Sequence, residues 1–148
     1  MQSLPHQPTP HQTIPTPFQR AAAKRCAHCQ RDLPTGEGTD VPFIGVVGPE
    51  CVRKYARLRA ALDAVNGLQA LEWDQGTVRL AFHVVWDLRR VGVAVEVVDV
   101  QADVKEVRIK GLSRKPRAVI ESWAQIQARF EQRLRDAQAE REAQEGAA

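Results

Sequence analysis

Three cysteines restrict what this chain can fold into more than any other feature. Cys26 and Cys29 have the spacing C-x2-C, and Cys51 follows Gly48-Pro49-Glu50 at the expected start of a helix. Thiolates at C-x2-C spacing converge on one metal ion from a tight turn, and a cysteine at a helix start supplies a further ligand. These are the only cysteines among the 148 residues. The sequence therefore predicts a metal site built from Cys26, Cys29 and Cys51, with Zn2+ as the ion, and a degenerate fold that binds no metal is the alternative.

A tetrahedral zinc site takes four ligands, and the sequence leaves the fourth one open. The positions one turn beyond Cys51 hold Lys54 and Tyr55, which do not normally bind zinc. Six other side chains remain as candidates: His6, His11, His28, Asp40, Glu50 and His83. His28 lies between two ligands, so we expect its side chain to point away from the metal. An open position would suit catalysis, but no motif places a general base beside it, and we predict a structural, non-enzymatic site.

The cysteine count and the N-terminus also bear on where the protein works. An odd number of cysteines does not suit a disulfide framework, and the first residues have neither the basic start nor the apolar run of a secretory signal. No stretch approaches the roughly 18 to 20 apolar residues that span a bilayer. We expect a cytoplasmic protein that does not cross a membrane.

The two ends of the chain differ in composition from its middle. Residues 1–22 are rich in Pro, Gln, Thr and His, a composition that buries too little apolar surface to offset the entropy of ordering. We predict that they form a disordered tail, and that residues 144–148 are disordered as well. The remaining length suits a metal-stapled module and one small core, but not two full domains.

Residues 23–67 are typical of a treble-clef-like zinc module. A turn-rich loop at 33–40 is followed by a short strand at 41–47 and by a helix with Pro49 or Glu50 in its first turn. That helix has apolar residues at helical spacing and ends near Asn66-Gly67. A cysteine knuckle, a short hairpin and a helix follow one another in the order that such modules use.

Residues 68–143 form the second predicted unit, which begins with an ambiguous apolar segment. Between Thr77 and Val91, strict alternation of apolar residues favours a strand. Thr77 as an N-cap, Gly92 after the last turn and an apolar stripe that includes Phe82 favour a helix instead. We favour the helix, and a β-meander remains the alternative.

A hairpin and a long helix complete the second unit. Residues 93–100 and 104–110 are rich in β-branched residues and are separated by a hairpin-length connection. An amphipathic helix follows from 116 to 143. The whole chain is therefore predicted to be an α+β protein.

The cysteine motifs resemble a small zinc-binding module of phage and bacterial proteins. Its pattern is C-x2-C-G-R-x-L, a short loop, and then G-x-G-P-x-C. Besides the first two cysteines, the matching residues are Arg31, Leu33, Gly48, Pro49 and Cys51. Gln30 replaces the glycine of that pattern, and the loop is longer here. The resemblance covers only the residues around 26–51 and implies a metal-binding module, whose roles are largely unassigned.

Basic residues gather around the predicted metal module and at residues 110–117, between a strand and a helix start. Cations and backbone amides at such a loop can approach a phosphate. We predict that a basic surface binds nucleic acid through six side chains: Arg53, Arg57, Lys110, Arg114, Lys115 and Arg117. A net charge of +3 permits this contact without requiring it, and an ordinary solvated surface is the alternative interpretation.

A helix at 77–91 followed by a hairpin would imitate a winged helix. Its reading face would consist of four side chains: Arg79, His83, Asp87 and Arg90. The connection at 101–103 is acidic, whereas a wing that contacts phosphate is basic, which weakens this interpretation. Trp73, Trp86 and Trp123 have aliphatic neighbours, so we expect them to anchor the core and not to stack on bases.

The C-terminal helix supports a second hypothesis about function. Its apolar stripe consists of Trp123, Ile126, Phe130 and Leu134, which pack on the core or on a second copy of the helix. A homodimer or assembly module is therefore the alternative to an accessory protein that binds nucleic acid. No phosphate-binding loop, dinucleotide fingerprint or nucleophile elbow occurs, and we do not predict an enzyme.

Overall fold

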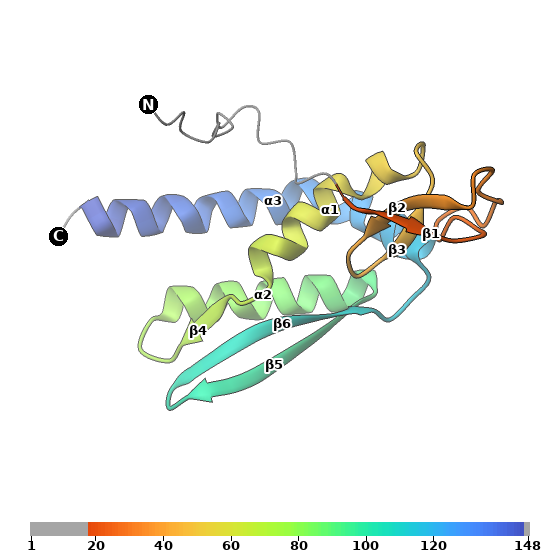
Figure 1. Cartoon of the computed structure of the whole chain (residues 1–148). Helices are drawn as coiled ribbons and strands as arrows, with labels where there is room; N and C mark the ends of the chain where they lie inside the picture. Colours follow the sequence, from red (N-terminus) through yellow and green to blue (C-terminus); the bar gives the residue numbers. More distant parts are fainter. Residues whose placement is uncertain (1–17, 147–148) are drawn as a thin grey trace, which may run out of the picture.

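The computed structural model describes residues 18–146, which form an α+β fold of two small sheets and three helices (Figure 1). The elements are β1 (Arg20–Ala22), β2 (Glu37–Val41), β3 (Gly45–Val47), α1 (Val52–Val65), β4 (Gln69–Leu71), α2 (Gln75–Val91), β5 (Val93–Gln101), β6 (Val104–Leu112) and α3 (Pro116–Gly146). The predicted α+β class is confirmed.

The first sheet is antiparallel with the order β1-β2-β3 and lies next to the cysteine motifs. Arg20 pairs with Thr39 and Ala22 with Glu37, so β1 adds a strand to the predicted short hairpin. The predicted disordered tail of residues 1–22 therefore extends too far, because its last residues gain backbone hydrogen bonds from β2. Residues 1–17 of that tail lie outside the described part of the chain.

Helix α1 begins slightly later than the sequence predicts. Pro49 and Glu50 lie in a turn, Cys51 is the N-cap, and the Val52 amide donates to the Gly48 carbonyl at 3.0 Å. At its other end, the Asn66 side chain accepts from the Ile109 amide of β6 at 3.0 Å. The helix that carries the third cysteine is thus tied directly to the second sheet.

Residues 77–91 are helical and belong to α2, as predicted, and do not form a strand. The N-cap of this helix is Asp74 and not Thr77, because Asp74 Oδ1 accepts from the amides of Gly76 (3.0 Å) and Thr77 (3.4 Å). Gly92 ends the helix with a left-handed φ of 104°, as expected for a glycine after the last turn. With both termini satisfied, the helix competes successfully with a strand, and the β-meander is wrong.

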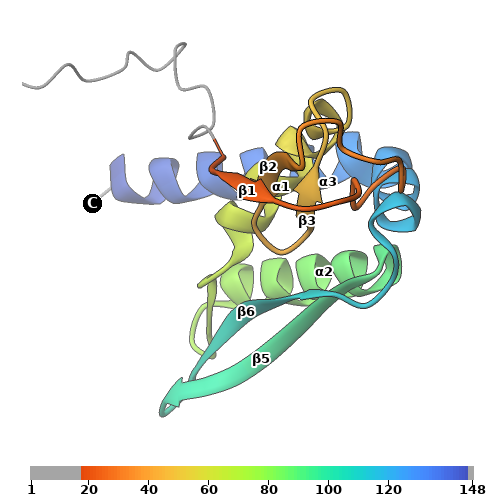
Figure 2. The ribbon, with the colours of Figure 1, turned by 45° about the vertical axis from the view of Figure 1, so that its right-hand side comes forward.

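The second sheet has the order β4-β6-β5, and all of its pairs are antiparallel. The predicted hairpin is confirmed, with Ala102-Asp103 between its strands, and the ambiguous residues after Gly67 provide β4. Helix α2 lies between this sheet and α3 (Figure 1), and the same order is visible after rotation (Figure 2).

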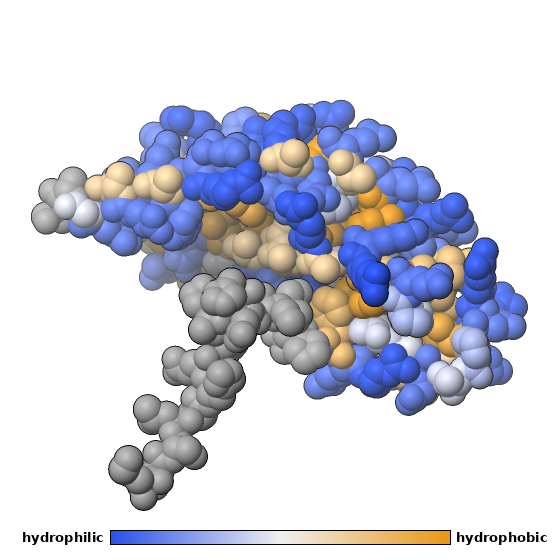
Figure 3. Space-filling view, turned by 90° about the horizontal axis from the view of Figure 1, so that it is seen from above, coloured by the Kyte–Doolittle hydropathy of each residue, from blue (hydrophilic) through white to orange (hydrophobic). Residues whose placement is uncertain are grey.

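Helix α3 is longer than predicted, because it continues to Gly146. The predicted disorder of residues 144–148 is therefore wrong for 144–146. The buried side chains of α3 all precede residue 131, and beyond Leu134 the helix is largely exposed. Figure 3 shows this end as mostly hydrophilic.

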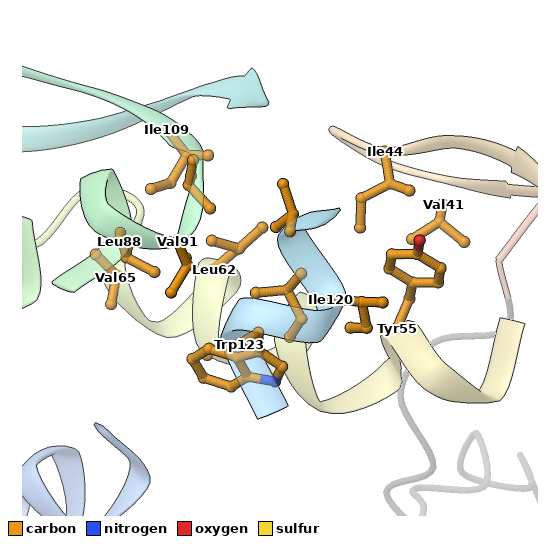
Figure 4. Close-up of a cluster of buried hydrophobic side chains, with 14 of the residues drawn as sticks. Val41, Ile44, Tyr55, Leu62, Val65, Leu88, Val91, Ile109, Ile120 and Trp123 are labelled. Carbon is orange, nitrogen blue, oxygen red and sulfur yellow. The ribbon is translucent and has the colours of Figure 1, made fainter. Parts of the chain in front are cut away.

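Both predicted units contribute to one core. Figure 4 shows Val41, Ile44 and Tyr55 of the cysteine-containing half in the same cluster as Leu88, Val91 and Ile109 of the second half. Trp123 and Ile120 of α3 lie between them. Residues 23–67 and 68–143 are therefore not separate hydrophobic units.

Two of the three tryptophans do not anchor the core. Trp123 is 1% exposed, as predicted, but Trp73 is 67% and Trp86 57% exposed, and Phe82 is 64% exposed. The buried face of α2 is Ala81, Val84, Val85, Leu88 and Val91. This face contacts α3 and the sheet, so Phe82 and Trp86 are turned toward solvent.

Candidate metal centre

The thiols of Cys26, Cys29 and Cys51 come together in the fold, with their sulfur atoms all within 4.8 Å of one another. In a tetrahedral zinc site with Zn–S bonds of about 2.3 Å, neighbouring sulfurs are about 3.8 Å apart. No disulfide joins the three cysteines. The cluster is therefore compact enough to hold one metal ion, as the sequence predicts.

Local backbone hydrogen bonds position each cysteine. The Cys26 amide donates to the Arg31 carbonyl at 2.9 Å, which closes the turn that carries Cys29. The Gly48 amide donates to Cys26 Sγ at 3.3 Å, and the Cys51 amide donates to the Gly48 carbonyl at 3.1 Å. Gly48 thus connects the turn of the first two cysteines to the start of α1.

The turn between Cys26 and Arg31 places one residue in the left-handed region of the backbone. Gln30, which stands at that position, has a left-handed φ of 64°. Glycine adopts this conformation without steric cost, whereas a residue with a Cβ atom is strained there. The Gln30 side chain partly compensates by donating to the Ala27 carbonyl at 3.2 Å.

The environments of two of the thiols differ. Burial raises the pKa of Cys26, but hydrogen bonds from the backbone at Cys29, Gly48 and His28 outweigh it and lower this pKa to about 7. Burial, together with the neighbouring Cys26 and Cys29 thiols, raises the pKa of Cys51 to about 12. A metal ion must therefore displace the Cys51 proton at neutral pH.

His28 is not one of the three grouped ligands, although it lines the cavity onto which the thiols open. Its ring is buried, and Nδ1 lies 2.6 Å from the Tyr55 hydroxyl oxygen. Burial lowers the pKa of His28, and Lys54 and Arg117 lower it further. Burial also raises the pKa of Tyr55, with a contribution from the thiolates. The His28–Tyr55 pair therefore adjoins the thiol cluster, and Nδ1 of His28 is engaged by the tyrosine hydroxyl.

The cluster opens onto a cavity of about 590 Å³. Asp32 and Glu50 are the carboxylates that line this cavity, whereas Asp40 and His83 do not line it. Among residues 18–146, only the three cysteines form a group close enough to hold a metal. His6 and His11 lie outside the described residues. The open side of the cluster thus faces a cavity whose lining includes His28, Asp32 and Glu50, none of which is grouped with the three thiols.

Cations surround this open side. Arg31, Lys54 and Arg117 line the cavity, and Lys54 and Arg117 also line a neighbouring one of about 360 Å³ beside α3. Sequence reasoning did not place Arg31 or Lys54 among the phosphate contacts. Their proximity to Arg117 depends on the packing of α1 against α3, which no local pattern signals.

The six predicted phosphate contacts divide into two groups. Three of them form ion pairs: Arg57 with Glu131, Lys110 with Glu96 (3.6 Å) and Arg117 with Glu121 (3.5 Å). Arg53, Arg114 and Lys115 are exposed and form no ion pair within the described part of the chain. This second group carries the free positive charge.

Packing of α3 against the rest of the chain buries parts of two predicted binding surfaces, the reading face of α2 and the dimer stripe of α3. Asp87 is only 6% exposed and contacts Arg129 and Arg133, so it is not part of an exposed reading face on α2. Trp123 and Phe130 of the predicted dimer stripe are buried within the chain, and Ile126 and Leu134 pack against the core. Trp123 and Phe130 are thus used for folding, whereas Ile126 and Leu134 are only partly buried.

The chain was compared with protein-family models, curated proteins and solved structures, and none of them matches. No described helix is both long enough and apolar enough to cross a bilayer.

Proposed function

We propose that the protein is a zinc-stabilised, non-enzymatic accessory protein that binds nucleic acid through the basic surface around its metal centre. One observation carries this proposal: Arg31, Lys54 and Arg117 line the cavity onto which the three thiols open. These three cations outnumber the two carboxylates of the same lining, Asp32 and Glu50, and this excess of positive side chains favours phosphate groups as ligands. A reducing compartment such as the cytoplasm suits the free thiols.

Zinc fits the three cysteines because thiolates and tetrahedral geometry are what this ion prefers. When bound, it cross-links the 26–29 turn to the start of α1. These segments enclose a sheet of only three short strands, with little apolar surface of its own. A metal cross-link adds to the stability that this sheet gains from the core it shares with the second half of the chain. His28 is engaged by Tyr55, and this favours a structural role over a catalytic one.

Nucleic acid is favoured because free cations adjoin the cavity. Lys54 lies in the first turn of α1 beside the exposed Arg53, and Arg117 lies in the first turn of α3 beside the exposed Lys115. Positive side chains near two helix N-termini together attract phosphate oxygens. Such contacts are independent of base sequence and weaken with added salt.

The test is binding of fluorescent DNA and RNA, measured by anisotropy over a series of salt concentrations. Affinity should fall as salt rises, and Arg114→Glu with Lys115→Glu should weaken binding at least about tenfold on every sequence alike. Arg135→Glu with Arg141→Glu is the matched control, because it makes the same charge change on the exposed, distant part of α3. Absent binding, or binding that does not depend on salt, contradicts the proposal.

A further inference from the structure

Helix α2 presents a long exposed face that neither α3 nor the sheet covers. The residues of this face recur at helical spacing: Arg79, Phe82, His83, Trp86 and Arg90. Arg79, Phe82, Trp86 and Arg90 are exposed, and His83 is half-buried. An exposed pair of large aromatic side chains on a small protein marks a site where something binds.

The aromatic side chains of this face are already arranged in parallel. The rings of Phe82 and Trp86 have centroids 6.4 Å apart and planes inclined by only 14°. The His83 ring meets Phe82 edge-on, with centroids 5.7 Å apart. Parallel aromatic planes at the surface form a platform on which a further flat ring can stack.

The charge of this face indicates an anionic partner. Arg79 and Arg90 flank the aromatic pair, and neither forms an ion pair with another described residue. The one acidic residue of α2 is Asp87, which is buried against α3 and neutralised by two arginines. The exposed face of α2 therefore combines aromatic planes with positive charge and carries no negative charge of its own.

The face continues into the basic segment after β6. The Arg114 side chain lies against Gly92, where a Cβ atom would be 2.7 Å from Arg114 Cδ. The Ser113 amide also donates to the Gly92 carbonyl at 2.8 Å. Arg114 therefore lies against the C-terminal end of α2, where Arg90 precedes Gly92 by two residues.

We propose that this face of α2 binds single-stranded nucleic acid, with unpaired bases stacked on Phe82 and Trp86 and phosphates held by Arg79 and Arg90. This inference rests on the proposed function. It specifies that the nucleic acid is single-stranded and that the exposed face of α2 binds it. Single strands are chosen because only unpaired bases expose their ring faces to an aromatic platform, whereas a duplex buries them in its own stack.

The experiment compares a labelled oligothymidylate of about 12 nucleotides with a duplex of the same length, by anisotropy on the full chain. The variants are Phe82→Ala with Trp86→Ala, and Trp86→Phe as the conservative change that keeps a stacking ring. Trp73→Ala is the matched control, because Trp73 is equally exposed but precedes α2 and lies off this face. Because all these side chains are exposed, the variants should fold, which circular dichroism and thermal melting check.

The double alanine variant should bind the single strand about 5- to 100-fold more weakly, while its weak duplex binding is unchanged. Trp86→Phe should keep most of the affinity and Trp73→Ala all of it. Unchanged single-strand binding by the double variant overturns the inference, and the proposed function still stands if charge reversal at Arg114 and Lys115 weakens binding. Absence of all binding by the wild type overturns both. If sedimentation shows that the wild type is a dimer and that the double variant is a monomer, the face binds a second copy of the chain. This result also overturns the inference.

Discussion

Asp87 of α2 and Arg133 of α3 form an ion pair in which the carboxylate is buried and the arginine is partly exposed, with the Arg133 Nη1 atom 2.8 Å from Asp87 Oδ2. The other carboxylate oxygen of Asp87 accepts from Arg129 Nη2 at 3.2 Å. Both oxygens of a side chain that is only 6% exposed are therefore satisfied from one neighbouring helix. This pairing adds a polar contact to the apolar packing between α2 and α3.

Asp87→Asn should destabilise the protein by about 2 to 3 kcal/mol, because it leaves two arginines without their shared counter-ion at a partly desolvated position. Asp99→Asn is the control. Its pair with Lys105 is exposed, at 3.8 Å, and should contribute less than about 1 kcal/mol. The free energy of unfolding from urea denaturation checks both values. Equal, small effects of the two substitutions would show that the buried pair does not hold α2 against α3.

Gln30→Gly should raise the free energy of unfolding by about 0.5 to 1 kcal/mol. The position has a φ of 64°, which glycine adopts without strain, and only one exposed hydrogen bond to Ala27 is lost. Thr35→Gly, at an exposed loop position without positive φ, should be neutral or destabilising. Thermal melting of the two variants measures the difference, and a lower melting temperature for Gln30→Gly would count against strain at this turn.

Local signals were sufficient to predict much of the fold. The hairpin of β5 and β6 follows from β-branched runs on either side of a short turn, and Gly92 marks the end of α2. The cysteine cluster follows from C-x2-C spacing and a cysteine at a helix start. Each of these features is decided by residues close together in sequence, which is why reading the sequence alone finds them.

Features that depend on distant partners were not predictable in the same way. Asp87 is polar and was expected at the surface, but its burial requires Arg129 and Arg133, about forty residues later. Trp86 was expected in the core, yet the packing of α2 between the sheet and α3 turns it outward. A helical stripe gives the period of the apolar residues, and tertiary packing decides which part of the stripe is covered.

Cys51→Ser should abolish metal binding and lower the free energy of unfolding of the protein. The wild type should carry one zinc per chain in native mass spectrometry, and the variant none, because two thiolates do not hold the ion in a structural site. Asp32→Ala is the matched control, since its carboxylate lines the same cavity but forms an exposed pair with Arg25 at 3.6 Å. We expect this control to retain its zinc, and loss of the metal there would instead identify Asp32 as the fourth ligand.

Metal affinity should fall steeply as the pH falls. Burial raises the pKa of Cys51 to about 12, so at pH 8 this thiol is protonated in the metal-free protein and must lose its proton to bind. The pKa of Cys26 is about 7, so below that pH a second proton must also be displaced. The metal competes with protons, and each displaced proton weakens binding by about tenfold per unit decrease in pH. Competition with a chelator at pH 8, 7 and 6 measures this dependence, after correction for the protonation of the chelator itself. An affinity that is the same at all three values would mean that the thiolates are not the ligands.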